Sequence, residues 1–123
     1  MPGCTIILGA GASRGVGGAL ARRFGREDQH IIIGSRTKDR VEALAREVNQ
    51  AGGSAEGVAV DVTSETDLDK LFAHVADKHP INALLYNDGN YAIIPIEKHE
   101  PKTVEHLWRV GCFGAYLNAK RAN

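Results

Sequence analysis

The sequence predicts an α/β domain whose parallel sheet, of about four strands, is covered by helices on both faces. Short apolar segments rich in β-branched residues recur along the 123 residues, and patterns typical of amphipathic helices separate them. A glycine-rich segment stands between the first apolar segment and the first helical pattern. These observations indicate a regular alternation of strands and helices, which is how parallel strands are connected.

The composition is that of one ordinary globular domain, spanning 1–123 with a single core. Hydrophobic residues make up 43% of the chain and charged residues 24%, and the 15 Lys and Arg are balanced by 15 Asp and Glu. This balance gives no indication of a nucleic acid or an acidic membrane surface as partner. No apolar stretch is long enough to cross a bilayer, and the start MPGCTIILGAG lacks the basic region of a secretory signal. We therefore expect a cytoplasmic protein without a membrane or nucleic-acid partner.

Cysteine and histidine usage predicts no disulfide and no metal site. Cys4 and Cys112 lie too far apart in sequence to form a metal knuckle, and two cysteines do not make a disulfide framework. Two reduced cysteines in a cytosolic protein are the simpler interpretation. The five histidines lack metal-ligand spacing with any other strong ligand.

The first half of the chain predicts two strands, each followed by a helix. CTIILG, residues 4–9, is typical of a buried strand, and HIIIGS, residues 30–35, is the second such segment. From Val16 to Phe24 an apolar residue recurs every fourth position, which marks one face of a helix. A second apolar stripe runs over residues 41–48 and is ended by AGG.

The second half repeats the pattern. EGVAVDV, residues 56–62, predicts the third strand, and INALLYN, residues 81–87, the fourth. Ser64 with Asp67 resembles a capping box that starts the helix between these strands. With right-handed crossovers, the order of a nucleotide-binding sheet would be 3-2-1-4.

The segment GAGASRGVG, residues 9–17, has the composition and position of a loop that holds a diphosphate. Gly11 allows a sharp turn off the strand, Gly15 lets the backbone approach a pyrophosphate, and Gly17 lets the helix pack close to the sheet. The unpaired amides and the dipole of the helix start attract an anion. Residues 1–40 also carry seven cations against three anions, a net charge of +4 around this loop.

The loop and three further segments resemble the short-chain dehydrogenase/reductase family, whose glycine motif reads Thr-Gly-x-x-x-Gly-x-Gly. Asp61-Val62 matches the family's adenine-contacting pair, LLYNDG its Asn-Asn-Ala-Gly segment, and VGCFGAY its Val-Asn-x-x-Gly-x-Phe segment. The match covers nearly the whole chain and corresponds to the N-terminal half of the family's Rossmann-like, doubly wound domain. The dinucleotide contacts that the resemblance and the loop imply are Gly11, Ser13, Arg14, Gly15, Val16, Gly17, Ser35, Arg36, Asp61, Val62, Asn87 and Gly89.

The end of the second predicted strand favours NADP(H) over NAD(H). A site for NAD usually has an acidic residue there, which holds the ribose hydroxyls. This sequence has Ser35 followed by Arg36, and a guanidinium accepts a 2′-phosphate that a carboxylate would repel. In the family, a basic residue at the position of Arg14 also accompanies NADP preference. Two solvated surface arginines, and NAD(H) as cofactor, are the alternatives.

The family's catalytic Ser and Tyr-x-x-x-Lys have no counterpart here, because they lie beyond the matched half. Tyr116 and Lys120 have the Tyr-x-x-x-Lys spacing but stand in the wrong helix. The family's helix asparagine is replaced by Gly111, and its Asn-Asn-Ala-Gly has become Tyr86-Asn87-Asp88-Gly89. We assign no catalytic residue in this chain. Asp88, beside the expected nicotinamide position, has the simpler interpretation of a turn residue in NDGN.

Three functions stay open at this stage. The first is an NADP(H)-binding, truncated relative of the reductases that lacks their catalytic groups. The second is an NADP-dependent oxidoreductase, transferring hydride between alcohols and carbonyls, that an oligomer partner completes. The third is a structural or interaction remnant that binds no dinucleotide.

The end of the chain predicts a homo-oligomer, and a two-fold dimer first. The fourth strand would form an apolar edge of the sheet, which isolated proteins avoid. The last helix, from about Lys102 to Ala122, is apolar on several sides and favours burial all round. The helix, the strand edge or both would form the interface. In the alternative, the helix folds back over the open edge of its own sheet.

Overall fold

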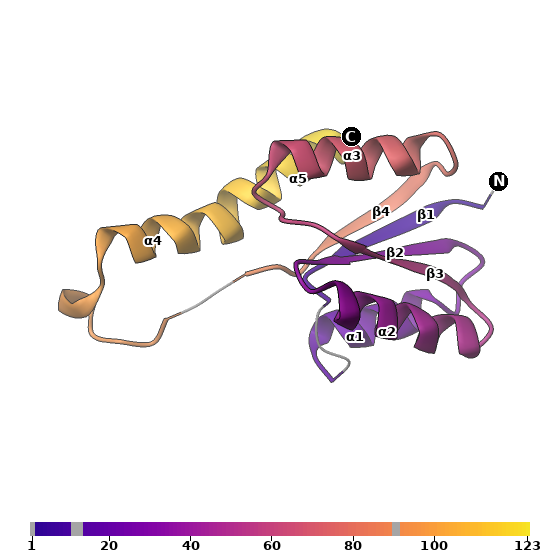
Figure 1. The fold of residues 1–123 in the computed structure, drawn as a ribbon, viewed down its shortest axis with the longest axis horizontal. Coiled ribbons are helices and arrows are strands. Elements are labelled where there is room, and N and C mark those ends of the chain that lie inside the picture. Colours follow the sequence, from indigo (N-terminus) through magenta and orange to yellow (C-terminus); the bar gives the residue numbers. More distant parts are fainter. Residues whose placement is uncertain (1, 11–13, 90–91) are drawn as a thin grey trace.

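A computed structural model describes residues 2–10, 14–89 and 92–123 of the chain. Four strands form one parallel sheet in the order β3-β2-β1-β4 (Figure 1), which confirms the predicted α/β class and strand order. The elements are β1 (Cys4–Leu8), α1 (Val16–Phe24), β2 (His30–Ser35), α2 (Lys38–Gln50), β3 (Ser54–Ala59), α3 (Glu65–Ala76), β4 (Ile81–Tyr86), the 3-10 turn η1 (Ile96–Lys98), α4 (Pro101–Trp108), the π-helical turn η2 (Arg109–Phe113) and α5 (Gly114–Ala122).

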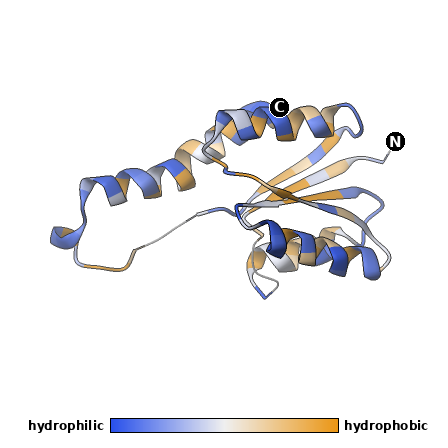
Figure 2. Cartoon of the chain, in the orientation of Figure 1, coloured by the Kyte–Doolittle hydropathy of each residue, from blue (hydrophilic) through white to orange (hydrophobic). Residues whose placement is uncertain are grey.

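Helices cover both faces of the sheet, with α1 and α2 on one face and α3 and α5 on the other (Figure 1). Successive strand residues point to opposite faces. Ile7 accordingly packs in the cluster that includes α1 and α2, whereas Ile6 and Ile32 pack in the cluster that includes α3 and α5. All five residues of β1 are buried. Figure 2 shows the hydrophobic colours concentrated in the strands, where the two cores meet the sheet.

The bounds of the third strand and one half of the cap of α3 differ from the sequence prediction, whereas α3 begins after Ser64 as predicted. The third strand begins at Ser54 and ends at Ala59 rather than spanning 56–62. The capping box before α3 is only half formed: Ser64 Oγ accepts a hydrogen bond of 3.2 Å from the amide of Asp67. The Asp67 carboxylate does not return to Ser64; it accepts from the amide of Asp61 at 3.0 Å. The cap therefore also fixes the chain that leaves β3.

The last helix is interrupted by the π-helical turn η2 at Gly111, where a Cβ would meet no atom within 4 Å. The hydroxyl of Tyr86 at the end of β4 donates a short hydrogen bond to the carbonyl of Val110 in this turn. Gly114 lies so close to the Tyr86 hydroxyl that a larger residue would displace it. Tyr86 thus holds the middle of the helix to the sheet.

The two ends of this helix have different surroundings. Helix α5 packs against α3, and Arg121 pairs with Glu65 at 3.2 Å and with Asp69 at 2.9 Å. Helix α4 extends away from the sheet (Figure 1), and Trp108 at its end is 51% exposed. Helix α5 therefore lies on one face of its own sheet, whereas α4 does not cover the sheet (Figure 1).

The remaining sequence predictions concern cysteines and membranes. Cys4 is buried in β1, Cys112 is exposed on η2, and both are free thiols. Among the helices of the described residues, none combines the length and the apolar character that crossing a membrane requires.

Candidate functional site

The four parallel strands end at the same edge of the sheet. Backbone hydrogen bonds continue between the residues that directly follow these strands. The amide of Gly9 donates to the carbonyl of Gly34 at 2.9 Å, and the amide of Asn87 donates to Leu8 at 2.8 Å. The amide of Val60 donates to the carbonyl of Ser35 at 2.8 Å. This carboxyl edge is where open α/β sheets bind ligands, at the point where the strand order reverses. Here that point lies between β1 and β4.

Helix α1 begins at this edge, and no side chain among the described residues caps it. Gly15 is its N-cap residue in extended conformation, and the first turn contains no acidic side chain. The first amides of a helix have no partner within the helix, so those of α1 face outward with the positive end of the dipole. The side chain of Val16 in this turn is 65% exposed, although it is apolar. An uncapped helix start beside an exposed apolar side chain suits an anion joined to an apolar ring.

Gly17 brings α1 against the end of β1. A Cβ on Gly17 would stand 2.5 Å from Ala10 Cα and 2.7 Å from the carbonyl oxygen of Gly9. No side chain fits at that separation, so the close approach predicted for Gly17 is confirmed. The helix start is thereby held at the level where β1 ends.

Gly9 performs a role that sequence reasoning missed. Its φ of 86° lies in the left-handed region that favours glycine. A Cβ there would also stand 2.5 Å from the amide nitrogen of Asp88. The Asn87 side chain donates from Nδ2 to the carbonyl of Gly9 at 3.3 Å. The signal available in the sequence was a glycine directly after a buried strand. In the structure, Gly9 joins the ends of β1 and β4.

Ser35 and Arg36 follow β2 at the same edge. Ser35 is buried, and its hydroxyl oxygen accepts a hydrogen bond of 3.2 Å from the amide of Thr37, just before α2. The side chain of Arg36 is exposed. Its positive charge favours the ionised forms of Asp61 and Asp88, so it acts on the chain after β3 and on the chain after β4. The exposed cation, rather than the buried hydroxyl, is the group free to meet a ligand.

Asp61 follows β3 and is held in its ionised form. Hydrogen bonds from Thr63, at 2.9 Å from the amide and 2.7 Å from the hydroxyl, lower the pKa of Asp61, and Arg36 and His106 add to the effect. The next residue, Val62, is buried. Its carbonyl accepts a hydrogen bond of 3.3 Å from Asn118 Nδ2 of α5.

Asn118 is a second residue that sequence reasoning missed. It is fully buried, and its Nδ2 also donates to the carbonyl of Gly114 at 2.8 Å. Its Oδ1 has no hydrogen-bond partner among the described residues. The signal was a single amide side chain between the apolar residues Leu117 and Ala119. Its hydrogen bond anchors the chain at Val62 to helix α5, within the core that both share.

Asp88 is a half-buried carboxyl group at the carboxyl edge, and its pKa is raised. It lies two residues beyond β4, and burial raises its pKa. The charge of Arg36 opposes this increase and that of Asp61 adds to it. Residues 87–89 contain no hydrogen-bonded turn. The described residues of the NDGN segment therefore do not form the turn that the sequence predicts.

The structure brings together ten of the twelve predicted contact residues at one edge, and they differ in exposure. Gly11 and Ser13 lie outside the described residues. The exposed residues are Arg14, Val16, Arg36, Asn87 and Gly89; the half-buried ones are Gly15 and Asp61; the buried ones are Gly17, Ser35 and Val62. The buried ones shape the backbone, and the others are at least partly exposed at this edge.

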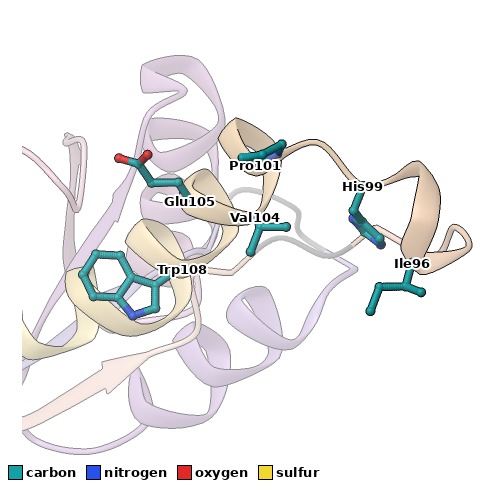
Figure 3. Close-up of a pocket in the computed structure, with 6 residues that line it drawn as sticks. All are labelled: Ile96, His99, Pro101, Val104, Glu105 and Trp108. Carbon is teal, nitrogen blue, oxygen red and sulfur yellow. The ribbon is translucent and has the colours of Figure 1, made fainter.

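Other groups lie apart from this constellation. Tyr116 and Lys120 line a shallow hollow against α3, together with Glu65 and Asp69. Across the described residues, no three His, Cys, Asp or Glu side chains are arranged to hold a metal ion. An open hollow of about 620 Å³ lies along η1 and α4, lined by Ile96, His99, Pro101, Val104, Glu105 and Trp108 (Figure 3). It belongs to the projecting helix and not to the carboxyl edge.

Comparisons with known proteins agree with this architecture. A family model described as short chain dehydrogenase matches residues 5–122. Hydroxysteroid dehydrogenase-like protein 2 of Mus musculus is 27% identical over 128 residues, which cover 98% of this chain and 26% of that protein. The 3beta-hydroxysteroid dehydrogenase 1 of Eggerthella lenta is 27% identical over 124 residues, which cover 99% and 47% respectively.

A solved structure shares the fold closely. The crystal structure of a metagenomic short-chain oxidoreductase in complex with NADP superposes with a TM-score of 0.88 at 26% identity, over 97% of this chain and 54% of that one. The chain thus spans about half, or less, of the length of the relatives it matches. With the family model matched over nearly all of its residues, the chain belongs to the short-chain dehydrogenase family.

Proposed function

We propose that the carboxyl edge of the sheet binds a nicotinamide dinucleotide, with the diphosphate at the start of α1. The observation that carries the proposal is the uncapped helix start at Gly15, held against the end of β1 by Gly17. The adenosine half would lie toward Arg36 and Asp61, and the nicotinamide half toward Asn87 and Gly89. Gly11 and Ser13 complete the proposed set from the sequence. The NADP complex of the metagenomic relative supports this assignment.

NADP(H) is the proposed form of the cofactor. Arg36 is exposed at the end of β2, where a carboxylate would select NAD. A 2′-phosphate there would exchange its water for a charge-assisted hydrogen bond from the guanidinium. Arg14, also exposed, adds a second cation near the helix start.

The proposed activity is cofactor binding without a catalytic centre of this chain's own. The family's Ser and Tyr-x-x-x-Lys have no counterpart among positions 1–123, and Gly111 stands where the family has its helix asparagine. Hydride transfer between a carbonyl and an alcohol, completed by an oligomer partner, is the second candidate. The exposed apolar face of the last helix favours it, because a partner there could supply further residues.

Binding and turnover can be separated in one series. Thermal unfolding is measured with NADPH, with NADH and without ligand, and NADPH consumption is then followed with a panel of aldehydes, ketones and quinones. A ligand at 100 times its dissociation constant stabilises the fold by about 2.7 kcal/mol. A shift without consumption supports the binding protein, and consumption supports the oxidoreductase. No shift with any dinucleotide contradicts both.

We also propose that the last helix forms a homodimer contact. Trp108, Phe113 and Tyr116 stack along it, with ring centroids 5.4 Å and 6.3 Å apart. Trp108 and Tyr116 are about half exposed, and Ile96 beside α4 is 85% exposed. Neighbouring exposed apolar side chains of this kind are typical of an interaction surface. A second copy would cover it, and light scattering tests this: Trp108→Glu should shift the protein toward monomer, whereas Ala43→Glu on the exposed side of α2 should not.

A further inference from the structure

A cluster of polar side chains lies at the amino edge of the sheet, opposite the edge proposed for the dinucleotide. Strands β2 and β3 begin there side by side, and His30 is paired with Ser54 in their register. Glu56 stands on the same face of β3 as Ser54, because alternate residues of a strand point to one face. His74 of α3 contacts Glu56 from above that face. The cluster thus combines a hydroxyl, two imidazoles and a carboxylate away from the carboxyl edge.

Glu56 is held between the two histidines as a hydrogen-bond acceptor. Its Oε1 lies 2.9 Å from His74 Nε2 and 3.4 Å from His30 Nε2. Burial raises the pKa of Glu56, but the hydrogen bonds and charges of His74 and His30 outweigh this effect and hold the pKa below its usual value. An ionised carboxylate only accepts hydrogen bonds, so Nε2 of His30 carries the hydrogen that points to it.

This contact decides which nitrogen of neutral His30 is free to accept a proton. With its hydrogen on Nε2, the ring has a bare Nδ1, and Ser54 Oγ donates to that nitrogen at 2.7 Å. The ring of His79 stacks on that of His30, with centroids 4.8 Å apart. His79 is itself fixed, because its Nδ1 donates to the Pro2 carbonyl at 3.1 Å. The carboxylate and the second ring therefore both restrain the orientation of His30.

Ser54 is accessible to a substrate. It is exposed, and together with His30 it lines an open hollow of about 180 Å³. A hollow of this size is smaller than the sites of drug-sized ligands and suits a short acyl group. Glu27 and Asp28 also line it, so its charge disfavours an anionic substrate.

We propose that Ser54 is a nucleophile, with His30 as its general base, for the hydrolysis of small neutral or cationic carboxylic esters. A serine within hydrogen-bond reach of a histidine that a third group orients is the arrangement of an activated nucleophile. Oγ forms a bond to the ester carbonyl carbon while its proton passes to His30 Nδ1. The ester C–O bond then breaks, and the proton leaves with the alcohol. Water, deprotonated by the same nitrogen, releases the acid, and that proton returns to Oγ.

Hydrolysis of para-nitrophenyl acetate tests the proposal. The parent protein carries Cys112→Ala, because the exposed thiol would also react with this ester. Ser54→Ala should reduce the rate to that of buffer. His30→Gln should reduce it about 100-fold, a usual contribution of a general base. Ser64→Ala is the matched control and should leave the rate unchanged, since that hydroxyl oxygen accepts from an amide and has no imidazole as base.

A fluorophosphonate gives a second readout, because it forms a stable bond to an activated serine. Mass spectrometry should find the phosphonyl group on Ser54 of the parent, and thermal unfolding checks that each variant is folded. Equal ester hydrolysis in the parent and Ser54→Ala, hydrolysis by the parent at only the buffer rate, or an unmodified Ser54 would each overturn the inference. Ser54→Ala should bind dinucleotides as the parent does, so these outcomes leave the proposed function standing.

Discussion

Gly17 of α1 lies so close to Ala10 that a Cβ on the glycine would stand 2.5 Å from the Ala10 Cα. This contact joins the first strand to the first helix at the carboxyl edge of the sheet. It fixes where the unpaired amides of α1 are presented, and it leaves no side chain between them and the strand end. The proposed diphosphate position depends on this one approach.

Gly17→Ala should destabilise the fold by about 1–3 kcal/mol, because the neighbour of the new methyl group is backbone and cannot move aside. It should weaken dinucleotide binding as well, since α1 must shift away from β1. Urea denaturation and a cofactor titration measure the two effects. Gly111→Ala is the control: a Cβ there meets nothing within 4 Å, so the stability should be unchanged or higher by up to about 1 kcal/mol. Similar losses in both variants would contradict this account of Gly17.

Arg36→Ala should weaken NADPH about 10- to 100-fold and change NADH much less. The guanidinium is exposed at the end of β2, where only the 2′-phosphate of NADPH would meet it, and a charge-assisted hydrogen bond contributes about 1.5–3 kcal/mol. Parallel titrations of the two cofactors provide the comparison. Arg46→Ala, an exposed cation on α2, controls for the loss of general positive charge. A variant of Arg36 that loses both cofactors equally would show that the NADP assignment is wrong.

Tyr86→Phe should cost about 1 kcal/mol of stability, because it removes the hydroxyl that donates to the Val110 carbonyl in the π-helical turn. The ring and its packing stay in place. Urea unfolding of this variant is compared with that of Tyr116→Phe, whose side chain is 56% exposed. We expect no change for Tyr116→Phe. Equal stability of Tyr86→Phe and the wild type would mean that the hydroxyl does not hold the helix to the sheet.

The two cysteines should react at very different rates. Burial raises the pKa of Cys4 to about 11, and Glu56 adds to this, whereas Cys112 is exposed. In the native protein at about pH 8, a thiol-reactive chromogenic reagent should label Cys112 alone, and denaturant should release the second thiol. Because the folded-state pKa is raised, the contribution of Cys4 to stability is present below its unfolded pKa and is lost as the pH rises through about 11. Rapid labelling of both thiols in the native state would contradict the burial of β1.

The sheet could be predicted from sequence because each of its causes is local. Apolar segments such as 30–35 alternate with helical stripes such as 41–48, and right-handed crossovers then leave the order 3-2-1-4. The close packing of Gly17 was predictable for the same reason, since glycine spacing after a strand has a fixed mechanical meaning. The grouping of strand ends at one edge follows from parallel pairing alone.

Features that join distant residues could not be predicted. The hydrogen bond from Asn118 to the Val62 carbonyl connects α5 to the chain after β3, and nothing in either segment indicates the other. The π-helical turn accepts a hydrogen bond from Tyr86, more than twenty positions earlier in the chain. The second half of the predicted capping box was wrong because the Asp67 carboxylate accepts a hydrogen bond from the Asp61 amide instead of the Ser64 amide.

The central claim is that the amides at the start of α1 hold a diphosphate. A crystal of this chain soaked with saturating NADPH tests it most directly. We predict electron density for the diphosphate against the first turn of α1, beside Gly15 and Val16, with the 2′-phosphate near Arg36. A helix start that stays empty at saturating NADPH, or one that protein atoms fill, would contradict the account.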